Sequence, residues 1–129
     1  MREEIRNLLG QAEEDLETAR VTVEHGRYYA AAFFAQQAAE KGLKALYLLM
    51  RREPTFTHDL SRIAEQLGAP VEVREDAADL TPEYLITRYP NAANAVPAKL
   101  YTKRKAEASL ERARRIMGWV KTSLPSEGS

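Results

Sequence analysis

The stretch YYAAAFFAQQAAEKGLKALYLLMRR, residues 28–52, decides the fold. It contains no proline and one glycine, and it is rich in alanine and leucine, which are strong helix formers. We therefore expect it to form the longest and most apolar helix of the chain. Gly26 before it and Pro54 after it are residue types at which helices end.

Helical periodicity continues on the N-terminal side of this segment and directly after it. Residues 5–23 carry apolar side chains at alternating spacings of three and four, the stripe of an amphipathic helix that ends at Gly26. Thr57 is the expected N-cap of a shorter helix, which ends at Gly68. Residues 71–89 have mainly helical spacing, and Thr81-Pro82 is expected to interrupt and restart the helix there.

The C-terminal third is expected to contain one loop and one helix. Residues 91–101 include Pro97 and lack a period, so they are interpreted as a loop. After Thr102, apolar residues at helical spacing predict a final amphipathic helix that runs to Leu124. No alternating strand pattern and no internal repeat occur. We predict an all-α protein, an antiparallel up-and-down bundle of four to five helices, in one domain over residues 1–124 with a disordered tail over 125–129.

The composition is that of a globular chain, and it excludes several kinds of site. Of the 129 residues, 44% are hydrophobic and none is cysteine, which excludes disulfides, thiolate metal sites and cysteine nucleophiles. The two histidines stand far apart, so we expect no metal site and no cofactor. No stretch approaches the ~20 apolar residues of a membrane span, so we expect a cytoplasmic protein without a membrane partner. A formal net charge of +0 argues against a DNA-coating protein, and the basic residues of 99–121 are interpreted as solvated helix faces.

Polar residues gather on one side of the helix expected over residues 28–52. At ~100° per residue, an arc of about 140° holds Gln36, Gln37, Glu40, Lys41 and Lys44. The arc is either the solvent side of a bundle helix, with Glu40 and Lys44 as an ordinary surface pair, or part of a groove or dimer surface. In the second interpretation, the nearby aromatic residues stack on a base and the lysines contact phosphate.

Two later motifs carry groups suited to chemistry. His58-Asp59 stands at the start of the third expected helix, where Asp59 meets the helix dipole favourably and where His58 is more often a packing or capping residue than a catalyst. Arg88-Tyr89-Pro90 places an aromatic ring at a helix end beside a planar guanidinium that suits a phosphate or a carboxylate. The alternative for Arg88 is a structural pair with an acidic neighbour.

Taken together, these motifs resemble the HEPN domain family over nearly the whole chain. The resemblance rests on Gly26-Arg27-Tyr28, on residues 36–46 (QQAAEKGLKAL), on His58-Asp59-Leu60 and on Arg88-Tyr89-Pro90, in that order. It implies a helical bundle, commonly a homodimer, whose shared cleft handles nucleotides or RNA. It also implies, as a possible partner, a minimal nucleotidyltransferase in a two-protein system of the toxin and antitoxin type.

The resemblance is incomplete where the family's ribonucleases carry their catalytic histidine. Those members have an Arg followed after four to six residues by His, whereas Ala93, Asn94 and Ala95 stand at these distances from Arg88. Because Asn94 cannot exchange a proton at neutral pH, RNA cleavage would need another acid or base. His58 could take that role only if the fold brings it near Arg88.

Three functions follow from these expectations. The favoured one is a homodimeric binding module without enzymatic activity, whose ligand-binding residues are Gln37, Glu40, Lys41, Lys44, Asp59, Arg88 and Tyr89. The second is a metal-independent ribonuclease toxin, with His58 and Arg88 as catalytic candidates. The third is a subunit that only binds another protein.

Overall fold

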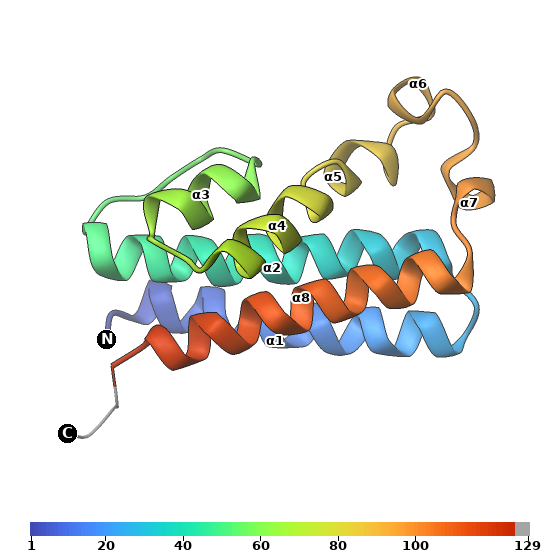
Figure 1. Ribbon diagram of the computed structural model, residues 1–129. Coiled ribbons are helices and arrows are strands. Elements are labelled where there is room, and N and C mark those ends of the chain that lie inside the picture. The colour runs from blue at the N-terminus through green and yellow to red at the C-terminus, as the bar shows by residue number, and fades with distance from the viewer. Residues whose placement is uncertain (126–129) are drawn as a thin grey trace.

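The computed structural model describes residues 1–125 and is entirely helical apart from the connections (Figure 1). Three long helices lie side by side: α1 (Glu3–Glu24), α2 (Tyr28–Arg51) and α8 (Lys103–Ser123). The shorter helices α3 (Leu60–Gln66) and α4 (Val71–Leu80) pack over α2 and α8. Three single-turn helices follow α4, namely α5 (Glu83–Ile86), α6 (Pro90–Ala93) and α7 (Pro97–Leu100). Most of the predicted disordered tail, residues 126–129, lies outside the described residues.

The helices alternate in direction, as predicted for an up-and-down bundle. In Figure 1, α1 runs away from the N-terminus, α2 returns, α4 and α5 lead the chain outward again, and α8 runs back toward the end at which α1 begins. The five helices with seven or more residues match the four to five that the periodicity predicts. The all-α bundle is therefore confirmed.

Helix α2 is the central element because its small side chains let its neighbours approach closely. Its alanines at 31, 35, 38, 39 and 45 are fully buried. Gly42 faces α8 so closely that a Cβ atom there would overlap Sδ of Met117. The main hydrophobic core lies between α2, α8, α3 and α4, and it includes Leu43, Leu46 and Ile116.

The structure confirms one predicted helix start and corrects another. The final helix begins directly after Thr102 as predicted, and the Thr102 hydroxyl caps it by accepting a hydrogen bond from the Lys105 amide at 3.2 Å. The predicted cap of α3 is wrong, because that helix begins two residues later and its N-cap is Asp59. The Thr57 hydroxyl accepts from the amide of Asp59 at 3.1 Å and thus stabilises the turn before the cap.

Residues 91–101 also differ from the prediction of a plain loop. Pro90 and Pro97 each stand at the start of a single helical turn, where a missing amide proton costs nothing. Asn94 ends the first of these turns in the left-handed region, with φ 56°. Asparagine is among the residues that tolerate this conformation, so its presence at this position has a backbone reason.

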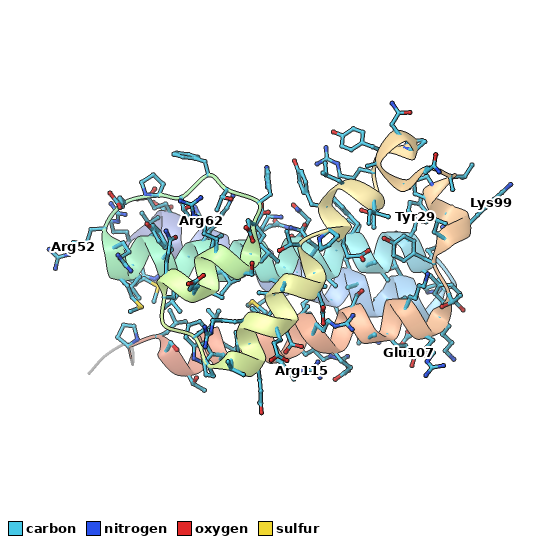
Figure 2. The ribbon with its side chains drawn as sticks, turned by 45° about the horizontal axis from the view of Figure 1, so that its top comes forward. Tyr29, Arg52, Arg62, Lys99, Glu107 and Arg115 are labelled. Atoms are coloured by element: carbon cyan, nitrogen blue, oxygen red, sulfur yellow. The ribbon has the colours of Figure 1, made fainter. Side chains whose placement is uncertain are left out.

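A bidentate ion pair also links the long α8 to α4. The guanidinium of Arg115, labelled in Figure 2, donates to both carboxylate oxygens of the buried Asp76 at 2.8 Å. Thr81, at the end of α4, accepts from the Leu60 amide at 3.0 Å and so joins the start of α3 to the end of α4. None of the helices within residues 1–125 is both long and apolar enough to cross a membrane.

Candidate functional site

The polar arc of α2 is not the solvent side of the bundle. Gln36 is fully buried and Glu40 is only 6% exposed, while Lys41 and Lys44 are partly buried. This arc faces α1 on one side and the segment that contains His58 on the other. The interpretation as an ordinary solvated face is therefore wrong, and the buried carboxylate of Glu40 needs partners inside the fold.

Glu40 is the centre of a polar cluster. Its Oε1 accepts a hydrogen bond from Nε2 of Gln36 at 3.1 Å and lies 2.8 Å from Nδ1 of His58. Its Oε2 lies 3.4 Å from Nζ of Lys44, so the predicted pair between these two residues is present but mostly buried. A carboxylate next to Nδ1 favours the form of His58 that carries its proton there, which leaves Nε2 to accept or donate a proton.

The position of His58 follows from the way in which α3 begins. The side chain of Asp59 accepts hydrogen bonds from the Arg62 amide at 3.3 Å and from the Ser61 hydroxyl at 2.7 Å. These bonds fix the first turn of α3, and the residue just before the cap is then held against α2. Asp59, a predicted ligand-binding residue, therefore has a structural role as the cap of α3, in which its Oδ1 accepts both bonds.

On its other side His58 meets an aromatic ring that the sequence motifs did not include. The His58 ring stacks on Tyr84 with 3.9 Å between the centroids and 14° between the planes. The guanidinium carbon of Arg88 lies 4.7 Å from the centroid of the same ring. Tyr84 and Arg88 are four residues apart along α5 and its last turn, so they lie on one face. The fold thus brings His58 and Arg88 to a common side chain.

Arg88 is held by aromatic rings. Its guanidinium carbon also lies 5.8 Å from the centroid of Phe33 and 5.2 Å from that of Tyr89. Among residues 1–125, it makes no hydrogen bond or ion pair with an acidic side chain. The structural pair considered for it is therefore absent from the described chain. We call His58, Tyr84, Arg88, Tyr89 and Phe33 the Tyr84 cluster.

The other predicted ligand-binding residues of α2 do not join the Tyr84 cluster. Nζ of Lys41 pairs at 2.6 Å with the carboxylate of Asp15, a residue of α1 that is 4% exposed. Nζ also donates to Oε1 of Gln37 at 3.1 Å, and Nε2 of Gln37 donates to Oε1 of Gln36 at 2.7 Å. Lys41 and Gln37 are thus linked to Glu40 only through a chain of hydrogen bonds.

Two residues of the site were missed by the sequence motifs. Tyr84 could have been found from its spacing, because an aromatic residue four positions before Arg88 on a helix stacks on it readily. Gln36 was placed on the polar arc, but nothing in the sequence marked it as the member that orients Glu40. The contact between Glu40 and His58 joins residues 18 positions apart, and local spacing carries no signal for it.

Comparisons with known proteins agree with this fold over most of its length. A family model described as HEPN domain matches residues 5–123. The structure of TT1696 from Thermus thermophilus is similar with a TM-score of 0.87 and 35% identity, over 95% of this chain and 100% of that one.

Two further solved structures are similar. ST0689, an archaeal HEPN homologue, has a TM-score of 0.78 and 33% identity, over 95% of this chain and 98% of its own. A HEPN domain protein from Thermotoga maritima has a TM-score of 0.72 and 27% identity, over 90% of this chain and 95% of its own. No curated protein matches the chain.

Proposed function

The chain belongs to the HEPN domain family, and on that premise we propose that it is a binding module for a nucleotide or a segment of RNA, with the Tyr84 cluster as its ligand surface. The observation that carries the proposal is the guanidinium of Arg88, which lies over three aromatic rings and is free of any carboxylate in the described chain. A guanidinium held in this way keeps its N–H donors for an incoming phosphate.

The exposure of the cluster supports the same ligand class. The side chain of His58 is 47% exposed and Tyr89 is 46% exposed, so two rings of the cluster are open to solvent. Bases stack on such rings regardless of sequence, while the adjacent cation contacts the backbone. Glu40 contacts Nδ1 of His58 and sets its orientation, and Lys44 pairs with Glu40.

The proposal is tested by binding of two probes, a fluorescein-labelled single-stranded RNA and ATP, to the parent and to two variants. Arg88→Ala should weaken binding by about 1.5 to 3 kcal/mol, roughly tenfold to a hundredfold, because a charge-assisted hydrogen bond to phosphate is lost. Arg74→Ala is the matched control, because Arg74 is an exposed arginine of α4 outside the cluster. If neither probe binds the parent, or if both variants bind equally well, the binding-module proposal fails.

One observation favours a second candidate, a metal-independent ribonuclease. The pair formed by Glu40 and His58, at 2.8 Å, has the arrangement of a carboxylate that orients a general base. Tyr84 places this base near Arg88, which could stabilise the charge on a phosphorane. Cleavage of single-stranded RNA in the presence of a chelator, abolished by both His58→Ala and Arg88→Ala in folded protein, would favour this candidate over the binding module.

We also propose a homodimer in which the Tyr84 clusters of two copies face each other. Large apolar side chains around the cluster support it: Phe56 is 82% exposed and Leu85 is 50% exposed. A two-fold interface brings one patch against its own copy, so both clusters would line a shared cleft.

A minimal nucleotidyltransferase is the further partner that we propose on the basis of family resemblance. Co-purification from the native host, with identification of the bound protein by mass, tests it.

A further inference from the structure

A cavity outside the Tyr84 cluster lies at the end of the bundle where α8 begins. It has a volume of about 680 Å³ and is formed by α5, α6, α7 and the first half of α8. Lys99 and Glu107, labelled in Figure 2, mark this end of the molecule. The volume is within the usual range for sites that bind small molecules. The lining combines apolar side chains, among them Ile86, Leu100 and Ala108, with three cations, Arg104, Lys105 and Arg112.

The three cations of the lining differ in what they contact. Nζ of Lys105 donates to the carbonyl oxygen of Leu100 at 3.1 Å, and Nε of Arg112 lies 3.3 Å from the carboxylate of Asp79. Arg104 makes no hydrogen bond or ion pair within the described residues. Its guanidinium can therefore turn toward a ligand without breaking an internal contact.

The carboxylate of the lining does not offset this positive charge fully. Glu83 accepts a hydrogen bond from the hydroxyl of Tyr101, and burial raises the pKa of the Glu83 carboxyl above its usual value, with Arg112 and Lys105 acting in the opposite direction. Burial, followed by the bond to Glu83, raises the pKa of the Tyr101 hydroxyl, which therefore keeps its proton. The two groups satisfy each other, and the remaining charge of the cavity wall is cationic.

We propose that this cavity is a binding site for a small organic anion, one that joins an apolar body to a single carboxylate, sulfonate or phosphate group. The apolar residues of the lining contact the body, and Arg104 binds the anionic group with support from the charges of Lys105 and Arg112. The site is separate from the Tyr84 cluster. Glu83 lines the cavity, whereas its neighbour Tyr84 stacks on His58. The proposal does not rest on the proposed function.

The test uses two fluorescent probes with the same kind of apolar body. Anilinonaphthalene sulfonate is anionic, and phenylnaphthylamine is its neutral counterpart. Arg104→Glu should weaken binding of the sulfonate on the order of tenfold or more and should leave the neutral probe unaffected. Lys103→Glu is the matched control, because it makes the same charge change one residue away, outside the cavity, and should leave both affinities within about twofold.

A second variant tests the location of the probes. Ala108→Trp should fill the cavity and abolish binding of both probes, with circular dichroism confirming that the helices remain. Arg88→Ala, in the Tyr84 cluster, should change neither affinity. The proposal is overturned if the parent does not bind the sulfonate, if Arg104→Glu and Lys103→Glu weaken it equally, or if Arg88→Ala removes it.

Discussion

At the level of single residues, two lysines of α2 that stand three positions apart have different ion-pair partners. Lys44 pairs with Glu40, the carboxylate that contacts His58, whereas Lys41 neutralises the buried Asp15 on α1. Sequence spacing places both on the same polar arc, since three residues advance a helix by about 300°. Only the packed structure distinguishes the lysine that pairs with the carboxylate beside His58 from the one that pairs with another helix.

We therefore expect Lys41→Met to lower the free energy of unfolding by about 1 to 3 kcal/mol, because it leaves a buried carboxylate with Gln11 as its only partner among the described residues. Urea denaturation measures the change. Lys121→Met is the control, since Lys121 and Glu13 form an exposed pair at 2.6 Å that should contribute less than about 1 kcal/mol. Equal losses in the two variants would contradict the role given to Asp15.

Glu83 gives a prediction with a definite dependence on pH. Burial raises the pKa of its carboxyl in the folded state, so folding favours the protonated form. Its contribution to stability is fully present below the unfolded pKa and is lost as the pH rises through the folded pKa. Glu83→Gln keeps an oxygen that accepts from Tyr101 but cannot ionise.

The stability of Glu83→Gln relative to the parent should therefore rise between about pH 4 and about pH 7. Urea denaturation of both proteins at the two pH values gives the comparison. A relative stability that falls over this range would mean that Lys105 and Arg112 outweigh burial at this carboxyl.

At the level of the helices, the sequence predicts well what depends on local pattern. The long helices α1, α2 and α8 begin and end near their expected residues, because amphipathic periodicity and glycine stops are local signals. The cap of α3 was placed at Thr57 although Asp59 is an equally good cap type, and the choice depends on how the loop meets α2. Proline-led single turns were missed because four residues are too few to show a period.

The candidate site could be predicted only in part, for the same reason. His58, Glu40 and Arg88 were singled out by their chemistry, and the fold brings them to one place. Their contacts with one another depend on how three separate segments pack, which no spacing within a segment encodes. Tyr84 joins them, although the sequence marks it only as one residue of the helical stretch 71–89.

The contact between α2 and α8 is tight at Gly42, and this predicts opposite effects for two glycines. Gly42→Ala should destabilise the protein by about 1 to 3 kcal/mol, because Met117 is buried and has to move away from the new methyl group. Gly118→Ala should stabilise it by about 0.5 to 1 kcal/mol, since no atom lies near the added Cβ and alanine favours the helix. Thermal unfolding of both variants checks the signs, and a stabilising Gly42→Ala would show that α8 does not pack this closely.

At the level of the whole molecule, three of the six exposed large apolar side chains within residues 1–125 belong to the Tyr84 cluster or stand within two positions of one of its members in the sequence. Phe56 comes from the segment before α3, while Leu85 and Tyr89 come from α5 and the residues just after it. Exposed apolar side chains are unfavourable in water, and we propose that a second copy of the chain buries these three. The bundle would then contribute residues from two copies to one cleft.

We expect light scattering to give twice the mass of one chain, and we expect Phe56→Ser with Leu85→Ser to give a monomer that keeps the same circular dichroism. Val71→Ser is the control, because Val71 is 54% exposed at the start of α4, away from the cluster. A parent that is monomeric at high protein concentration, or a double variant that stays dimeric, would contradict the proposed interface.

The hydrogen bonds that run from Lys41 through Gln37 and Gln36 to Glu40 have only one possible polarity. Each amide accepts through its oxygen from the cationic side and donates through its nitrogen toward the carboxylate. If Gln37 were replaced by Glu, which has the same shape, an oxygen would face the Gln36 oxygen. Turning the Gln36 amide over would only move the conflict to Glu40, where two oxygens would then meet. A mismatch introduced next to Lys41 can thus be relieved by one proton, either on the new carboxyl at position 37 or, once the Gln36 amide has turned over, on the carboxylate that holds His58.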